Sequence, residues 1–313
     1  MSDCRRIATS ATVSAAAILA LLVGTACAGA QTPAAATPGF DGPRAHEHIR
    51  QLVAIGPRVA GTPGASKARD YITAQVKALG LTVEEQPFEA RTPAGPTKMV
   101  NLRVTLQGPS ASAGLGRLII AGHYDTKLFR EFTFVGANDG GSSAAFLIEI
   151  ARVLKARKNA LPIEILFLDG EEAVVDWHTE NDNTYGSRYY VEAARQSGTL
   201  AQIRALVLVD MIGDRDLRIS REANSTAWLT DIIWGAARTL KRREFLERET
   251  PIEDDHLRFL EAGVPAVDII DLDYPAWHTA GDTLEKVSAA SLQAVGEVLL
   301  AALPDIEKRL VKP

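Results

Sequence analysis

The sequence has few cysteines and no excess of basic residues. Both of its cysteines, Cys4 and Cys27, lie within the first thirty residues, so the rest of the chain has no disulfide and depends on its core for stability. The 34 Lys and Arg residues are outnumbered by 39 Asp and Glu residues, and a formal net charge of −5 argues against a nucleic-acid-binding protein. With 313 residues, 46% of them hydrophobic, the chain can bury a sizeable core.

The sequence also lacks an uninterrupted apolar run that could span a membrane, for which about 20 residues are needed. The apolar run 15–23 is shorter and is followed by small residues, with the A-x-A pattern of a cleavage site at 28–30. We therefore expect a signal peptide at residues 1–30 and no transmembrane span. The protein is predicted to be exported, either to the periplasm or out of the cell.

Two other interpretations of the N-terminus are open. Cys27 follows small residues and is a candidate for a lipid anchor, and Arg5-Arg6 are a weak signal for twin-arginine export. Residues 31–43, rich in Ala, Pro and Thr, are expected to form a flexible leader. If cleavage follows Ala30, Gln31 becomes the new N-terminal residue.

Residues 44–313 alternate between short apolar runs and helical patterns, which predicts one α/β domain. Its sheet is expected to be mixed and mostly parallel, with helices on both faces. Expected strands are an antiparallel pair, 81–90 and 98–107, and four buried strands, 117–122, 163–168, 204–209 and 264–270. Expected helices are 62–79, 142–155, 185–196, 225–240 and 288–311.

Acidic residues and histidine gather at the ends of the predicted strands, where open α/β sheets bind their ligands. They are His123, Asp125, Asp169, Glu171, Glu172 and Asp210, with Asp139 in a glycine-rich loop and Asp268 inside a strand. A single such Asp usually caps a helix or a turn. Several on one edge would repel one another unless they bind a cation, and histidine with carboxylates suits zinc.

Adjacent Glu171 and Glu172 point to opposite sides of an extended segment, so one can bind a metal while the other acts as a general acid or base.

The remaining candidates each have two interpretations. His278 alone is more often structural than a ligand. Trp177 and Trp277 are either core residues or pocket walls. Asp254 either caps the helix that follows or forms a hydrogen bond with a residue of the site.

Several motifs, in this order, resemble those of the M28 zinc aminopeptidase superfamily and, within it, the glutaminyl-peptide cyclotransferases. They are GPR (56–58), HYDTK (123–127), FVGAND (134–139), FLDGEEA (167–173), YGSR (185–188), LVDMIG (208–213), DDHLRFLEAGVP (254–265) and WHT (277–279). The resemblance runs from about residue 123 to the C-terminal helix. It implies the zinc-exopeptidase (phosphorylase/hydrolase-like) fold for the catalytic domain 44–313.

The resemblance also implies roles for individual residues. One Zn²⁺ would be bound by Asp139, Glu172 and His278, with Glu171 as the acid and base. Asp210 and Asp254 would form a proton-sharing network beside Glu171, and Trp177 and Trp277 would line the pocket. The reaction would convert the N-terminal Gln of a peptide or protein to pyroglutamate and release ammonia. We expect a monomer.

The chain departs from the animal cyclases at Asp268, where they carry a histidine, so part of the hydrogen-bond network is altered. The alternative is an M28 aminopeptidase with two zinc ions, whose second ion would be bound by His123 and Asp210. A catalytically silent binding module would be expected to have lost Glu171 or a metal ligand, and none is missing.

Overall fold

The computed structural model of the chain describes residues 38–112, 114–179 and 181–311. The expected signal peptide and most of the expected leader, residues 31–37, lie outside the described residues. The boundaries of the leader and of the catalytic domain therefore stay predictions.

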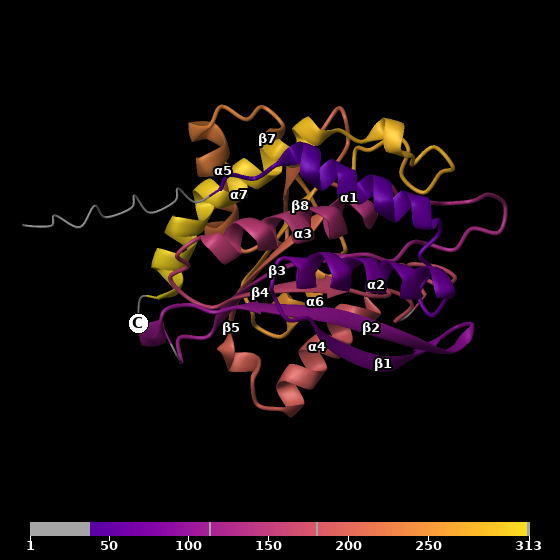
Figure 1. The fold of residues 1–313 in the computed structure, drawn as a ribbon, viewed down its shortest axis with the longest axis horizontal. Helices are drawn as coiled ribbons and strands as arrows, with labels where there is room; N and C mark the ends of the chain where they lie inside the picture. The colour runs from indigo at the N-terminus through magenta and orange to yellow at the C-terminus, as the bar shows by residue number, and fades with distance from the viewer. Residues whose placement is uncertain (1–37, 113, 180, 312–313) are drawn as a thin grey trace, which may run out of the picture. The chain divides into compact units, whose positions relative to one another are not determined.

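The centre of the fold is a six-stranded sheet with the strand order β1-β2-β4-β3-β5-β8 (Figure 1). β1 and β2 pair antiparallel, as do β2 and β4, whereas β4, β3, β5 and β8 run parallel. The prediction of a mixed, mostly parallel sheet is confirmed. The strands are β1 (Glu84–Thr92), β2 (Gly95–Leu106), β3 (Arg117–His123), β4 (Ile163–Leu168), β5 (Ile203–Asp210) and β8 (Ala266–Ile270).

Helices cover both faces of this sheet because neighbouring residues of the buried strands point to opposite sides. Ile120 and Val207 pack on the face covered by α1, α2, α3, α5 and α7, and Ile119 and Leu206 on the face covered by α4 and α6 (Figure 1). The helices are α1 (Gly42–Ile55), α2 (Pro63–Ala78), α3 (Gly141–Ala156), α4 (Tyr185–Gln196), α5 (Ala227–Thr239), α6 (His256–Glu261) and α7 (Ala289–Leu310). Three short 3₁₀ helices are η1 (Ser110–Ser112), η2 (Leu200–Gln202) and η3 (Leu284–Lys286).

The ends of α2 follow from its sequence. Thr62 caps the first turn by accepting a hydrogen bond from the amide of Ala65, and Pro63 occupies a position whose N–H would have no partner. Gly80, with φ of 70°, ends the last turn in the left-handed region. The helix predicted at 62–79 is therefore confirmed.

α7 is long and apolar enough to cross a membrane by composition alone. In the fold it packs on α1, α3 and α5, and 56% of its most apolar window is buried. Its apolar residues therefore serve the protein core.

The sequence did not predict a second, two-stranded parallel sheet made of β6 (Ile219–Glu222) and β7 (Phe245–Thr250). β6 has only four residues and β7 is largely exposed and charged, so neither shows the apolar pattern of a buried strand. The predicted strand 264–270 begins later, at Ala266. The strand predicted at 81–90 is displaced toward the hairpin turn, which joins Thr92 to Gly95.

Candidate active site

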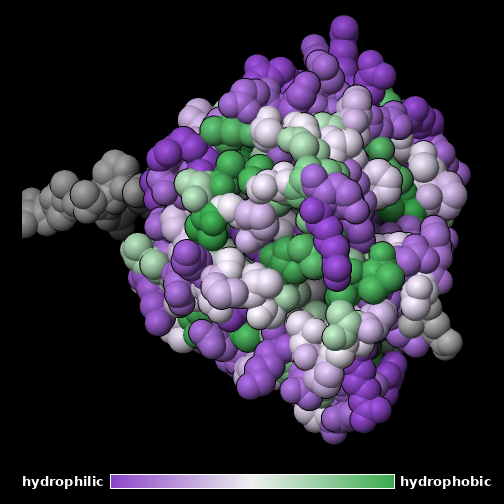
Figure 2. Space-filling model, turned by 90° about the vertical axis from the view of Figure 1, so that its right-hand side faces the viewer, coloured by the Kyte–Doolittle hydropathy of each residue, from purple (hydrophilic) through white to green (hydrophobic). Residues whose placement is uncertain are grey.

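The carboxyl ends of the parallel strands meet at one edge of the sheet, where a pocket of about 410 Å³ opens. Figure 2 looks onto this side of the molecule, where apolar patches lie on either side of a hydrophilic ridge. The pocket brings together all eight residues expected in the primary site. They are Asp139, Glu171, Glu172, Trp177, Asp210, Asp254, Trp277 and His278.

Asp139, Glu172 and His278 form a group that can hold a metal ion, because one ligand atom from each lies within 4.8 Å of the others. His278 Nε2 lies 3.4 Å from Asp139 Oδ2 and 3.4 Å from Glu172 Oε2. Asp139 Oδ2 is buried and has no hydrogen-bond partner in the described part of the chain. Imidazole and carboxylate groups are both zinc ligands, and catalytic zinc sites use three protein ligands and leave one position open. The three residues therefore fit a zinc ion.

Asp282 holds the loop that carries Asp139 through the backbone amides of that loop. The Asp282 carboxylate accepts hydrogen bonds from the amides of Asn138 (2.8 Å) and Asp139 (3.1 Å), and from the hydroxyl of Tyr274 (2.8 Å). Gly140 follows with φ of 70°, a conformation that favours glycine. The backbone of Asp139 is thus held in place by hydrogen bonds within the protein.

Glu171 and Glu172 are fixed by Asp125, which accepts hydrogen bonds from their two amides at 3.1 and 3.3 Å. The side chains of Glu171 and Glu172 point in different directions. Glu172 faces His278, whereas Glu171 Oε2 lies 3.8 Å from Nδ1 of His123. Burial raises the pKa of Glu171 well above its usual value; the charge of Glu172 adds to this rise and His123 opposes it. A buried carboxyl with a raised pKa suits a residue that acts as both general acid and general base.

His278 has an unusual backbone conformation for a residue with a side chain, with φ of 53°. Trp277 stacks on its ring, with centroids 4.4 Å apart, and Phe129 and Phe134 meet the ring edge-on. Burial would lower the pKa of His278, but Asp139 and Glu172 raise it to about 9. Strained residues of this kind gather at functional sites.

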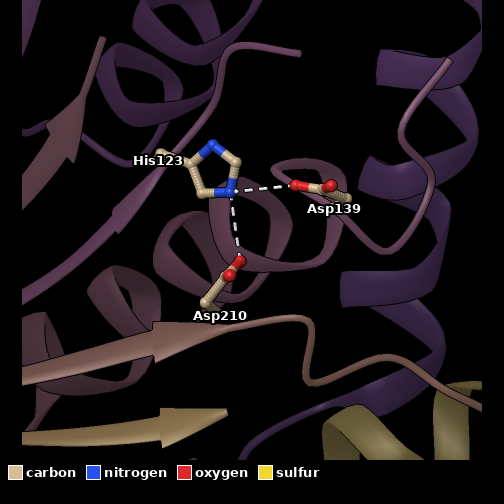
Figure 3. Close-up of side chains that lie close together, drawn as sticks. All are labelled: His123, Asp139 and Asp210. Carbon is tan, nitrogen blue, oxygen red and sulfur yellow. Dashed lines mark hydrogen bonds and ion pairs between the residues drawn. The ribbon is translucent and has the colours of Figure 1, made fainter. Parts of the chain in front are cut away.

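A second group that can hold a metal ion consists of His123, Asp139 and Asp210 (Figure 3). Nε2 of His123 lies 3.1 Å from Asp210 Oδ1 and 3.3 Å from Asp139 Oδ1. The same oxygen of Asp210 accepts hydrogen bonds from the hydroxyl of Ser143 (3.1 Å) and the amide of Met211 (2.8 Å). His123 and Asp210 are therefore placed for hydrogen bonding as well as for a second ion.

Two further buried acids form, together with His256, a third group that could hold a metal ion. Asp254 and Asp268 are buried, and burial together with their neighbours' charges raises the pKa of both well above the usual value. His256 Nδ1 lies 3.6 Å from Asp268 Oδ2, and its other ring nitrogen lies 3.0 Å from Glu222 Oε2. Asp268 therefore lies close to a histidine of α6, although the two side chains are not hydrogen-bonded to each other.

The walls of the pocket are mainly apolar. Trp177 donates a hydrogen bond from its indole nitrogen to Glu253 (3.3 Å), which fixes the ring at the pocket mouth. Trp277 is 43% exposed, and Met211 and Ile270 line the pocket further in. Such a pocket can hold a short chain with one polar end.

Sequence reasoning assigned no role to Arg58, Asp125 or Asp282, although the first two stand in motifs that it singled out. Arg58 is buried, and burial lowers its pKa to about 10, so the guanidinium stays charged. Its contacts, like those of Asp282, join segments that are far apart in the sequence. Only the motif Gly56-Pro57-Arg58, which belongs to the family resemblance, pointed to the position of Arg58.

The model of peptidase family M28 matches residues 101–303. A glutaminyl-peptide cyclotransferase-like protein of Bos taurus is 30% identical over 82% of this chain and 73% of its own length. This chain belongs to the glutaminyl-peptide cyclotransferases of peptidase family M28. The family resemblance noted in the sequence is thereby confirmed.

Solved structures of M28 relatives share the fold. A glutaminyl cyclase of an Acidobacteriales bacterium is 41% identical, with a TM-score of 0.82, over 89% of this chain and 99% of that one. A protein of Bacteroides thetaiotaomicron described as a leucine aminopeptidase precursor is 26% identical, with a TM-score of 0.77, over 85% of this chain and 98% of that one. Cyclases and a protein described as a peptidase thus share this M28 architecture.

Proposed function

We propose that this chain is a zinc-dependent glutaminyl-peptide cyclotransferase that converts the N-terminal Gln of peptides and proteins to pyroglutamate and releases ammonia. The observation that carries the proposal is the position of Glu171. It is a buried carboxyl with a raised pKa, and it lines the same pocket as the group Asp139, Glu172 and His278 and the two tryptophans. Similarity to cyclotransferases over most of the chain supports the same reaction.

Asp139, Glu172 and His278 would bind the metal. A Zn²⁺ ion bound there would supply Lewis-acid polarisation of a carbonyl oxygen. Asp282 and Asp125 hold the backbones of two of these ligands, so the chain presents the ligand set in a fixed arrangement. Ligands held by hydrogen-bonded partners in this way bind metal more tightly.

Trp177 and Trp277 would confine the Gln side chain so that it folds back toward its own α-amine. The reaction needs no second substrate, because nucleophile and electrophile belong to one residue. Holding the two groups in contact replaces a bimolecular encounter by an intramolecular one. The open pocket mouth leaves room for the rest of the peptide.

Glu171 would carry the protons. The substrate's α-ammonium first loses one proton to solvent. Glu171 then accepts a second proton from the amine nitrogen as this nitrogen attacks the γ-carbonyl carbon and forms the ring C–N bond. Glu171 then delivers a proton to the amide nitrogen as the old C–N bond breaks and ammonia leaves. Asp210 and Asp254 line the same pocket as Glu171 and would adjust its proton affinity.

One observation favours a second candidate function, a dinuclear aminopeptidase. His123, Asp139 and Asp210 can hold another ion, and a structural relative is described as a leucine aminopeptidase precursor. Such an enzyme would hydrolyse the bond after an N-terminal Leu. The two functions therefore differ in both product and metal count.

We further propose that the catalytic domain, 44–313, is exported with cleavage after Ala30. The N-terminal signal features of the sequence support this proposal. The mass of the N-terminal peptide from protein expressed in its native compartment tests it. Cleavage after Ala30 gives a peptide beginning at Gln31, whereas a lipid on Cys27 gives a heavier, lipid-modified one.

The function is tested by incubating the purified, zinc-loaded protein with a peptide that begins with Gln. Mass spectrometry is expected to show the loss of one ammonia and no loss of a residue. If the peptide instead loses its first residue, or stays intact at saturating concentration, the proposed function is wrong.

A further inference from the structure

Arg58 lies in the segment between α1 and α2 and is fully buried beneath the two loops that carry the candidate metal site. All hydrogen bonds that its guanidinium makes in the described part of the chain go to backbone carbonyls. A buried cation without a bonded carboxylate is unfavourable unless many other groups solvate it. A role other than packing is therefore expected for the buried Arg58.

The guanidinium joins two loops that are otherwise separate. Nε donates to the carbonyl of Tyr124 (2.9 Å), next to Asp125, whose carboxylate holds the amides of Glu171 and Glu172. The two terminal nitrogens donate to the loop that ends in Asp139. They bond to the carbonyls of Val135 (2.6 Å), Gly136 (2.8 Å) and Asp139 (3.4 Å).

The loop of Asp139 is thus held from two sides by opposite charges. Arg58 binds its carbonyl oxygens, and Asp282 binds the amides of Asn138 and Asp139. A side chain at Gly136 would come within 3.2 Å of the Arg58 guanidinium, so the loop is packed directly on it. The backbone amide of Arg58 also donates to Thr126 (2.8 Å), which anchors the arginine to the other loop.

We propose that Arg58 is a positioning residue that sets the distance between the metal ligands Asp139 and Glu172 by clamping their supporting loops together. Only a planar guanidinium offers five donors in fixed directions, whereas a lysine ammonium has three on one atom. Lysine at this position keeps the charge but cannot bond to both loops. The proposal rests on the proposed metal site.

The test compares zinc dissociation constants of the full-length protein, measured by competition with a chelating indicator, for the wild type and Arg58→Lys. The dissociation constant of Arg58→Lys is expected to rise about 10- to 100-fold, as for other residues that support metal ligands. Thr126→Val, which removes only the bond to the Arg58 amide, is expected to give a smaller rise. It also serves as the test variant if Arg58→Lys fails to fold.

Glu307→Gln is the matched control for general destabilisation. Glu307 is a buried residue of α7 that accepts hydrogen bonds from Arg157 and Ala160, none of which lines the pocket. Its variant is expected to lower Tm but to leave zinc binding unchanged. If Arg58→Lys and Thr126→Val bind zinc as tightly as the wild type, or if Glu307→Gln weakens zinc to the same extent, the role of Arg58 is overturned. A wild-type protein that binds no zinc overturns the metal site itself.

Discussion

Nε2 of His123 lies 3.1 Å from Oδ1 of Asp210, at hydrogen-bond distance (Figure 3). In the dinuclear alternative these two residues would bind a second ion, whereas in the proposed cyclase they belong to the hydrogen-bonded surroundings of Glu171. Ser143 and the amide of Met211 share the same Asp210 oxygen, and this supports a role in hydrogen bonding. The number of bound ions separates the two accounts.

We predict one zinc ion per chain for both the wild type and His123→Ala, counted by elemental analysis after dialysis. His278→Ala is expected to raise the zinc dissociation constant by about 100-fold or more, because it removes a ligand rather than a supporting residue. Chelation should abolish wild-type activity and added zinc restore it. Two ions in the wild type and one in His123→Ala would support the peptidase instead.

Glu171→Gln is predicted to lower kcat by about 10²–10⁴-fold, since general acid–base catalysis contributes that much. The substitution keeps the size of the side chain but cannot carry a proton, so zinc content and Tm should stay close to those of the wild type. Glu192→Gln, on the exposed surface of α4, is the matched control and should have full activity. Full activity of Glu171→Gln would mean that another group carries the proton.

Trp177→Ala is predicted to raise KM by roughly tenfold with a smaller effect on kcat, because an aromatic wall contributes about 1 kcal/mol or more to binding. Steady-state kinetics on a Gln-initiated peptide measures both constants. Glu253→Gln, which weakens only the bond that fixes the indole, should give an intermediate KM. An unchanged KM for Trp177→Ala would show that the ring lies outside the substrate's path.

Glu222 is predicted to make the fold sensitive to acid. Burial alone would raise its pKa, but hydrogen bonds from His256 and from the amides of Asn224 and Ile252 lower it from 4.5 to about 2. A folded pKa below the unfolded value stabilises the protein above pH 4.5, and this contribution is lost as the pH falls toward 2. Urea unfolding of Glu222→Gln should therefore show lower stability than the wild type at pH 7 and a smaller difference at pH 3. An equal difference at both pH values would contradict this assignment.

The core of the fold could be predicted because its strands are short, apolar and bounded by polar residues. β4 was predicted at its observed bounds and α4 as well. β6 and β7 could not be predicted, because the two strands pair with each other and neither has an apolar pattern of its own. Similarly, the sequence placed acids at the strand ends, but the choice of Asp139, Glu172 and His278 among them came from the family resemblance.

Residues that support the site were the hardest to foresee. Asp282 and Arg58 act on the loop of Asp139 from distances of 143 and 81 residues along the chain. Nothing in local spacing links them to that loop. The proximity of His256 to Asp268 was also not foreseen, since the two residues belong to different elements.

The most direct test of the central claim is a competition between two peptides that differ only in their first residue, Gln or Leu, in one reaction with zinc-loaded enzyme. Mass spectrometry over time is predicted to show loss of ammonia from the Gln peptide and an unchanged Leu peptide, with the loss of ammonia slowed by about 10²–10⁴-fold in Glu171→Gln. Release of free Leu, with the Gln peptide uncyclised, would contradict the account and identify a peptidase.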